Sequence, residues 1–276
     1  MNSEQLFQQI QTKQSYLCVG LDPAKEKLPA AVMSSDDPVF AFNKAIIDAT
    51  APYAVAFKPN TAFYETDGSR GWASLEKTMA YIRTQYPEIF VIADAKRGDI
   101  GNTSARYASA FFKQLDADAV TVAPYMGADS VLPFLGFDDK WVVLLALTSN
   151  TGSADFQYVE NNEHFPLYKQ VIGKATQWAS HEQMMFVVGA THPDEIGAIR
   201  EMAPEYFFLV PGVGVQGGDL EAVSRAGLNR RAGLLVNASR SILYASSGTD
   251  FAQKAAEEAL MIQQQMKHQL ELAKLI

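Results

Sequence analysis

Short apolar runs recur along the whole chain, and segments with helical periodicity separate them. The runs are continuous rather than alternating, which is typical of strands in a parallel sheet that is covered on both faces. Helical periodicity is clear at residues 71–86 and 103–115, and residues 250–273 are predicted to form a closing helix. The eight predicted strands lie at residues 16–21, 53–58, 89–94, 118–122, 141–147, 185–190, 206–212 and 233–238.

Eight strands that are each followed by a helix predict an α/β protein with a single (β/α)8 (TIM) barrel. A doubly wound open sheet is the competing architecture, but it usually has fewer strands. No linker rich in Pro, Gly or Ser and no internal repeat divides the 276 residues. We therefore expect one domain over residues 1–276.

Composition and charge narrow the possible partners and the location. The formal net charge is −8 and no basic run stands out, so we expect no nucleic-acid partner, and any anion site must be local. One cysteine, Cys18, permits no disulfide within the chain, which favours a cytoplasmic location; it lies in an apolar run and is predicted to be a core residue. The first 14 residues lack a signal-peptide pattern, and no apolar stretch approaches the roughly 18 residues of a membrane span, so no membrane partner is expected.

Charged residues gather after the third predicted strand, in the stretch IADAKRGDIGNTS (92–104). Asp94 and Lys96 are two positions apart, so their side chains should leave the strand end on the same side. Asp99 follows in the loop, and Lys58 ends the neighbouring strand. Barrel active sites lie at the carboxyl ends of strands, so these four charges are candidates for one site in which each keeps its neighbours ionised. The spacing is equally compatible with a solvated ion-pair patch in which Asp99 caps a helix.

A second candidate feature is the glycine-rich stretch PGVGVQGGD (211–219). Its glycines at 212, 214, 217 and 218 would let the backbone approach a ligand, and the next segment begins a helix whose N-terminal amides suit an anion. Arg240, just past the eighth strand, could add a bidentate fork to a phosphate. A glycine-rich turn with a surface arginine is the alternative. We favour phosphate because loops seven and eight are the usual phosphate site of this fold.

The other reactive side chains give weaker indications. The four histidines, at 164, 181, 192 and 268, are scattered without metal-ligand spacing. Paired carboxylates could bind Mg²⁺, but Lys58 and Lys96 would compete for the same charge, so we expect neither metal nor cofactor. Asp22 ends the first predicted strand and is either a site residue or a helix N-cap followed by Pro23.

Taken together, these motifs resemble those of the orotidine 5′-phosphate decarboxylases. DAKRGDIGNT resembles the Asp-x-Lys-x-x-Asp signature of that family, PGVGVQGGD its phosphate loop, SRSI its final arginine motif, and GLDP and FKPN its first two strand ends. The match spans residues 18–244 and is most similar to the longer bacterial (type 2) subfamily. The resemblance implies a TIM-barrel decarboxylase domain over residues 1–276. It would convert a nucleoside monophosphate, orotidine 5′-phosphate, to uridine 5′-phosphate and carbon dioxide in pyrimidine biosynthesis, without a cofactor.

The resemblance also implies catalytic roles for the charged cluster. Lys96 would donate a proton to C6 after carbon dioxide leaves. Asp94 would lie against the substrate carboxylate, with Lys58 fixing Asp94 and touching the ribose. Asp99 would reach the ribose of the active site in the other subunit, which implies a homodimer.

The remaining positions of the resemblance would bind substrate. Asp22 would hold a ribose hydroxyl, and Thr103 would act with Asp99 across the subunit interface. Gln216 and Arg240 would grip the phosphate. Thr148 and Ser149 would recognise the pyrimidine edge, and the sequence leaves open whether these two or Asn150 make that contact.

The sequence leaves two alternative functions open. Sugar-phosphate lyases with the same signature use Mg²⁺, and in them the second-strand position resembles an acidic metal ligand. Here that position is Lys58, which argues against the metal-dependent reaction. A non-catalytic protein that binds a phosphorylated ligand would explain Gln216 and Arg240, but it would leave the four-charge cluster without a purpose.

Overall fold

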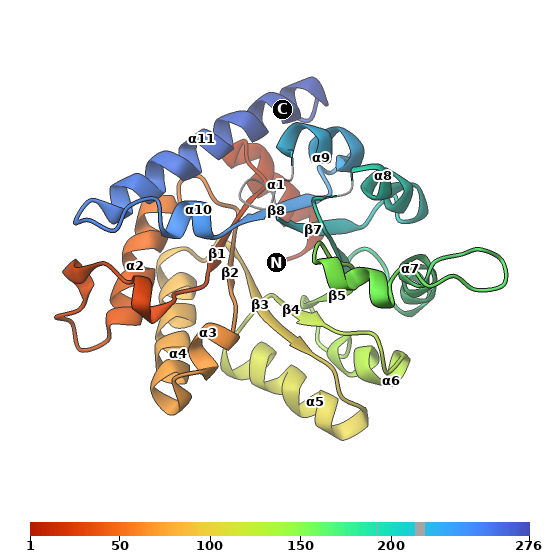
Figure 1. Cartoon of the computed structure of the whole chain (residues 1–276), viewed down its shortest axis with the longest axis horizontal. Helices are drawn as coiled ribbons and strands as arrows, with labels where there is room; N and C mark the ends of the chain where they lie inside the picture. The colour runs from red at the N-terminus through yellow and green to blue at the C-terminus, as the bar shows by residue number, and fades with distance from the viewer. Residues whose placement is uncertain (192, 213–218) are drawn as a thin grey trace.

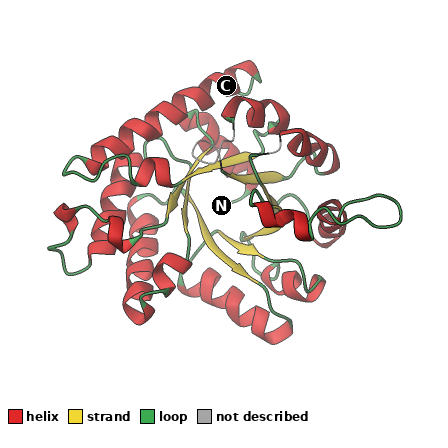
Figure 2. Cartoon of the chain, in the orientation of Figure 1, coloured by secondary structure: helices red, strands yellow, loops and turns green. Residues whose placement is uncertain are grey.

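The computed structural model describes residues 1–191, 193–212 and 219–276. Within these residues, eight parallel strands pair in chain order and close into a barrel, with helices arranged around the outside (Figures 1 and 2). The prediction of a (β/α)8 barrel is therefore confirmed. The strands are β1 (Leu17–Leu21), β2 (Ala56–Pro59), β3 (Phe90–Arg97), β4 (Ala119–Val122), β5 (Trp141–Leu147), β6 (Met184–Val188), β7 (Phe207–Pro211) and β8 (Leu234–Ala238).

Helices follow each strand and cover the outer face of the barrel (Figure 2). No helix of the described residues is long and apolar enough to cross a membrane. The α-helices are α1 (Ser3–Lys13), α2 (Pro38–Thr50), α3 (Ala62–Glu65), α4 (Gly68–Gln85), α5 (Gly101–Ser109), α6 (Ala128–Val131), α7 (Leu167–Trp178), α8 (Pro193–Met202), α9 (Leu220–Gly227), α10 (Arg240–Leu243) and α11 (Phe251–Leu272). Short 3₁₀ turns span Lys25–Lys27, Ala30–Val32, Leu132–Phe134 and Thr151–Asp155, and a π-helical turn spans Ala110–Gln114.

The third strand departs from its predicted end in a way that bears on the site. It was expected to end at residue 94, but β3 continues to Arg97. Ala93 pairs with Val120 and Arg97 pairs with Val122, so the register shifts between these two pairs. The Ala123 amide then donates to the Arg97 carbonyl at 2.8 Å and fastens the strand end. The charged side chains interrupt the apolar pattern here although the backbone remains paired.

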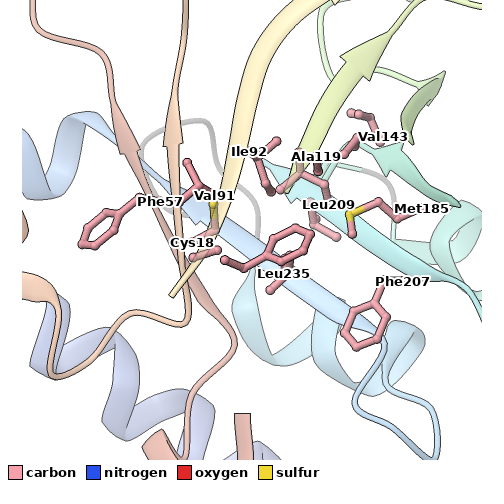
Figure 3. Close-up of a cluster of buried hydrophobic side chains, with 14 of the residues drawn as sticks. Cys18, Phe57, Val91, Ile92, Ala119, Val143, Met185, Phe207, Leu209 and Leu235 are labelled. Atoms are coloured by element: carbon pink, nitrogen blue, oxygen red, sulfur yellow. The ribbon is translucent and has the colours of Figure 1, made fainter. Parts of the chain in front are cut away.

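Apolar side chains fill the barrel, as Figure 3 shows for one cluster that includes Cys18, Phe57 and Leu235. Cys18 is fully buried in β1, which confirms the prediction that it is a core residue. Burial raises the pKa of its thiol to about 12. The thiol is therefore neutral near pH 7 and serves packing rather than nucleophilic chemistry.

The N-terminal segment occupies the end of the barrel at which the strands begin. The Trp141 indole N–H donates to the Met1 carbonyl at 2.8 Å, and the Met1 ammonium lies 3.2 Å from Asp118 Oδ1. Asp118 and Trp141 stand at the starts of β4 and β5. This end is thus occupied, and the carboxyl ends of the strands remain for the functional site, as is usual for this fold.

Candidate active site

Lys58, Asp94 and Lys96 form a chain of two ion pairs at the carboxyl ends of β2 and β3. Lys58 Nζ donates to Asp94 Oδ2 at 2.8 Å, and Lys96 Nζ donates to Asp94 Oδ1 at 2.6 Å. The side chains of Lys58 and Asp94 are 6% and 8% exposed, whereas that of Lys96 is 51% exposed. The expectation that Asp94 and Lys96 lie together and are joined by Lys58 is confirmed. Lys58 is therefore buried with Asp94, whereas Lys96, which is bonded to the same carboxylate, is half exposed.

The two lysines keep the buried carboxylate ionised. Burial by itself would raise the pKa of Asp94, but the charges of Lys58 and Lys96 hold that pKa well below its ordinary value. Burial would likewise lower the pKa of Lys58, but Asp94 and Asp22 together raise it above its ordinary value. Both members of the buried pair are therefore charged throughout the physiological pH range.

We expect Asp94 to stay ionised when ordinary aspartates titrate. Its folded pKa is depressed, so its contribution to stability is present above the unfolded pKa of about 3.9 and is lost only as the pH falls through the lower folded value. Carboxyl ¹³C NMR of aspartate-labelled protein would follow this group, with the resonance identified by its loss in Asp94→Asn. That resonance should show no inflection between about pH 3 and 5, the range in which an ordinary aspartate with a pKa of about 3.9 titrates. An inflection in this range would contradict the ion-pair account.

A cavity of about 540 Å³ opens beside the ion-pair chain at the carboxyl ends of the strands. Its lining combines cations and carboxylates, so the negative overall charge of the protein does not exclude a local anion site. Arg240, at the first position of α10, lies on its wall together with Gly212, whose φ is +96°. The lining residues are Asp22, Ala24, Glu26, Lys27, Lys58, Asn60, Phe63, Asp94, Pro211, Gly212, Asn237, Ser239, Arg240, Ser241 and Tyr244.

Asp22 belongs to this cavity and does not cap a helix. Residues 22–24 are not helical, and the short 3₁₀ turn that follows has Ala24, not Asp22, as its N-cap. The N-cap interpretation of Asp22 is therefore wrong. The Tyr244 hydroxyl donates to the Asp22 carbonyl at 2.9 Å and accepts from the Ala24 amide at 2.8 Å, which fixes the loop. Asp22 Oδ1 is buried and accepts no hydrogen bond from the described residues, and the Asp22 residue lines the cavity, so its carboxylate is a candidate acceptor for a ligand hydroxyl.

Asp99 and Thr103 lie apart from the ion-pair chain. The Asp99 carboxylate accepts from the amide of Ile100 at 2.7 Å, and the N-cap position of α5 is Ile100. The N-cap interpretation of Asp99 is therefore wrong. Within the described chain, no hydrogen bond or ion pair joins Asp99 to Lys58 or the rest of the cluster, and Thr103 is exposed on α5. The expectation of a four-charge cluster within one chain is met for three of its members.

The loop after β5 faces a different, more apolar cavity of about 800 Å³, whose lining includes Thr148 and Trp178. Gln157 fixes the loop, because its side chain accepts from the Thr148 amide at 2.8 Å and donates to the Thr148 hydroxyl at 2.9 Å. Ser149 packs against Gly189, where an added Cβ would come within 2.8 Å of the Ser149 amide nitrogen. The structure does not bring Thr148 or Ser149 into the described lining of the Asp94 cavity.

The predicted phosphate cradle is described in part. Gln216 and the glycines at 214, 217 and 218 lie outside the described residues, as does His192. The helix expected after this loop is confirmed as α9, which begins at Leu220, with the Asp219 carboxylate accepting from the Glu221 amide at 2.9 Å. Gly212, directly after β7, and Arg240, which begins α10, line the same cavity, as the phosphate hypothesis requires.

Sequence reasoning missed several residues that contact the site. Thr121 in β4 bonds to Asp94 at 3.0 Å, Asn237 in β8 lies on the cavity wall, and Tyr244 holds the Asp22 loop. A polar amide side chain inside an otherwise apolar strand is the signal that could have identified Asn237, whereas a threonine is common in strands and gives little signal. Tyr244 follows a short helix and carries no comparable signal.

Metal ligation finds no support in the described residues. Within them, no group of three or more histidine, cysteine, aspartate or glutamate side chains could hold a metal ion. The carboxylate at the centre of the site, Asp94, is already occupied by two lysines. The expectation of a metal-free site stays a prediction.

Fold and site together define a (β/α)8 barrel whose charged site lies at the carboxyl ends of its strands, the usual arrangement of enzymes with this fold. Residues 15–255 match the orotidine 5′-phosphate decarboxylase / HUMPS family, and the chain belongs to that family.

Several relatives are similar over their full length. The chain is 56% identical over 267 residues to the orotidine 5′-phosphate decarboxylase of Phocaeicola vulgatus, covering 97% of this chain and 98% of that protein. It is 55% identical to the orotidine 5′-phosphate decarboxylase of Porphyromonas gingivalis, with both chains covered completely. The structure of Leishmania donovani OMP decarboxylase matches with a TM-score of 0.79 at 38% identity, covering 95% of this chain and 99% of that one.

Proposed function

We propose that the protein decarboxylates orotidine 5′-phosphate to uridine 5′-phosphate and carbon dioxide, a step of pyrimidine biosynthesis, with residues 1–276 acting as one domain. The observation that carries the proposal is the Lys58–Asp94–Lys96 ion-pair chain, with Lys58 and Asp94 buried, beside a cavity that Arg240 also lines. Relatives named orotidine 5′-phosphate decarboxylase, which are about 55% identical over nearly the full chain, support the same conclusion.

The substrate pose follows from the charges of the cavity. The phosphate would bind at the Gly212–Arg240 side, where a guanidinium offers a bidentate fork. A ribose hydroxyl would donate to the carboxylate of Asp22, which lines the cavity. The orotate carboxylate would then lie against Asp94, and the Thr148–Ser149 loop would close over the pyrimidine.

Repulsion between the substrate carboxylate and Asp94 supplies only part of the rate. Two carboxylates about 4 Å apart repel by about 4 kcal/mol at an effective dielectric constant of 20. That corresponds to about three decades of rate at about 1.36 kcal/mol per decade. Breaking the bond between C6 and the carboxylate leaves an electron pair on a vinylic carbon with no electron sink, which costs far more. Stabilisation of the developing carbanion must therefore dominate.

Lys96 is the group that can provide this stabilisation. Its ammonium is bonded to Asp94 Oδ1 at 2.6 Å, its side chain is half exposed, and Asp94 lines the cavity. As the carboxylate departs, the electron pair on C6 would attract the ammonium, which then gives its proton to C6 and becomes a neutral amine. A preorganised charge of this kind, in a site closed to water by substrate binding, is usually the largest single contribution to catalysis. Binding energy from the remote phosphate would drive that closure.

A direct assay tests the proposal. Purified protein is mixed with orotidine 5′-phosphate and a chelator, and the ultraviolet absorbance is followed with chromatographic detection of uridine 5′-phosphate. Loss of substrate with formation of product would support the metal-free decarboxylase. Inertness here, combined with turnover of a keto-sugar phosphate in Mg²⁺, would assign the protein to the lyase branch; Lys58 at the second strand end disfavours that result.

We also propose a homodimer in which Asp99 and Thr103 complete the partner's site. Support comes from their position: among the described residues no hydrogen bond or ion pair joins Asp99 to the ion-pair chain, and Thr103 is exposed. Apolar side chains are exposed near them, with Ile100 at 53% and Leu132 at 46%, and both line one small surface pocket. An exposed apolar patch of this kind is typical of an interface.

Complementation between two inactive variants would test the shared site. Asp99→Ala and Lys96→Ala chains are each expected to be nearly inactive, whereas a mixed dimer would contain one site with both native residues. Unfolding and refolding the two variants together at equal amounts should therefore restore about a quarter of the wild-type activity, since half of the dimers are mixed and half of their sites are native. Absence of any recovery, although the mixed dimer forms, would show that Asp99 acts within its own subunit.

A further inference from the structure

Thr121 lies at the centre of β4 and touches two members of the ion-pair chain. Its side chain is buried, with 1% relative exposure. Its hydroxyl oxygen accepts from the backbone amide of Lys96 at 2.8 Å, and the hydroxyl donates to Asp94 Oδ1 at 3.0 Å. The direction of both bonds is fixed, because an amide can only donate and an ionised carboxylate can only accept. The hydroxyl therefore connects the backbone of Lys96 to the carboxylate of Asp94.

The backbone explains why a side chain is needed at this place. Between the pairs Ala93–Val120 and Arg97–Val122, three residues of β3 face the single residue Thr121 of β4. Lys96 adopts φ +44°, a left-handed conformation that is unusual for a residue other than glycine. Such conformations persist where the surroundings enforce them, and they concentrate at functional sites. The Lys96 amide finds its acceptor in the Thr121 hydroxyl, which stabilises the irregular end of β3.

The same hydroxyl also fixes the side-chain end of Lys96. Asp94 Oδ1 accepts from both Thr121 Oγ1 and Lys96 Nζ, while Asp94 Oδ2 is bound to Lys58. Rotation of the carboxylate would break the bond to Thr121. Thr121 thus holds Lys96 twice, once through its backbone and once through the carboxylate to which its ammonium is bonded.

We propose that Thr121 is a positioning residue that sets the place of the Lys96 ammonium relative to C6 of the substrate. The inference rests on the proposed decarboxylase function and deepens it. Thr121 itself does not line the cavity, so its effect should fall on the chemical step rather than on substrate binding. Small errors in the position of a catalytic group are costly, since proximity and orientation account for a large share of enzymatic rate.

Two substitutions separate the hydroxyl from the shape of the side chain. Thr121→Val keeps the branched shape and removes both hydrogen bonds, whereas Thr121→Ser keeps the hydroxyl and removes a methyl group. We expect Thr121→Val to lower kcat by about 10- to 100-fold, the usual effect of losing a hydrogen bond to a charged group. KM and the dissociation constant for uridine 5′-phosphate should change by less than about threefold. Thr121→Ser should retain kcat within about threefold of the wild type.

Thr78, on α4 and outside the described lining of the cavity, provides a control for the loss of a buried threonine hydroxyl. It is also fully buried, its hydroxyl donates to the Ser74 carbonyl at 2.7 Å, and it accepts from the Asn43 amide at 3.0 Å. Thr78→Val therefore removes one donated and one accepted hydrogen bond of a buried threonine hydroxyl, here with the Ser74 carbonyl and the Asn43 side-chain amide. It should lower the melting temperature while leaving kcat within about twofold.

The outcomes distinguish this inference from the function on which it rests. A wild-type protein that does not consume orotidine 5′-phosphate would overturn the proposed function. If the wild type is active, a Thr121→Val kcat within threefold of it, or a Thr121→Ser kcat as low as that of Thr121→Val, would overturn the positioning role. If Thr121→Val does not fold, Thr121→Ala removes the hydroxyl without placing a methyl group against Asp94, and the same limits apply to it.

Discussion

Lys96→Ala should abolish turnover, with kcat lowered by at least about 10⁴-fold. The substitution removes a proton donor, which contributes about 10² or more, and a preorganised charge at the developing carbanion, which contributes about another 10² or more. Binding should be much less affected, because Arg240, Asp22 and Lys58 remain in the cavity. Single-turnover measurement of uridine 5′-phosphate formation, with the dissociation constant of the product measured by calorimetry, would separate the two effects.

Lys77 supplies the matched control for this experiment. Its side chain is 54% exposed and its Nζ lies 2.8 Å from Asp37, close to the 51% exposure and the 2.6 Å contact of Lys96 with Asp94. Lys77→Ala therefore removes a similar lysine–aspartate pair from the surface of α4 and should leave kcat unchanged. Near-normal activity in Lys96→Ala would refute the role of Lys96 as proton donor and carbanion stabiliser.

The fold could be predicted from the sequence because each strand of a covered parallel barrel is buried on both faces. Such strands appear as continuous apolar runs, and all eight runs coincide with observed strands. The pattern is weaker where burial and pairing separate. At β3 the backbone stays paired to Arg97 while the side chains become charged, so the predicted end fell three residues short.

The candidate site could be predicted where side chains leave strand ends. Lys58, Asp94 and Asp22 lie on the same cavity because parallel strands bring their carboxyl ends to one edge. Loop residues could not be placed in this way. Asp99 follows β3 closely in sequence, yet it turns toward the Ile100 amide and away from the cluster. Spacing along a loop does not define the direction of a side chain, so the sequence could not place Asp99 relative to the cluster.

Thr121 illustrates a different limit of sequence reasoning. A threonine in a strand is common, since its branched side chain fits the pleated surface, so its type carries little information. Its importance comes from the register shift opposite it and from the left-handed conformation of Lys96. Both are properties of the paired backbone, and the apolar pattern contains neither.

Arg240→Ala should weaken binding and rate together, lowering kcat/KM for orotidine 5′-phosphate by about 10²- to 10⁴-fold. Two charge-assisted hydrogen bonds to a phosphate contribute about 1.5 to 3 kcal/mol each, or about 3 to 6 kcal/mol in total. At about 1.36 kcal/mol per decade this is about two to four decades of rate. Arg240 is exposed and forms no ion pair with another described residue, unlike Arg225 and Arg230, so its loss should leave the fold intact. Steady-state kinetics and thermal unfolding would measure the two quantities.

The nucleoside orotidine, which lacks the phosphate, tests whether Arg240 acts through the phosphate of the substrate. Arg240 should contribute nothing to its turnover, so wild type and Arg240→Ala should process orotidine equally slowly. Arg225→Ala on α9 is the matched control, since that side chain is 74% exposed and lies 3.9 Å from Glu221; it should behave as wild type with both substrates.

An equal loss on both substrates would mean that Arg240 supports the fold at the end of β8 rather than binding the phosphate. No loss on either would make it the surface arginine of the alternative interpretation. A fall in kcat, and not only in kcat/KM, that is confined to the phosphorylated substrate would show that binding energy gained at the phosphate is used at C6.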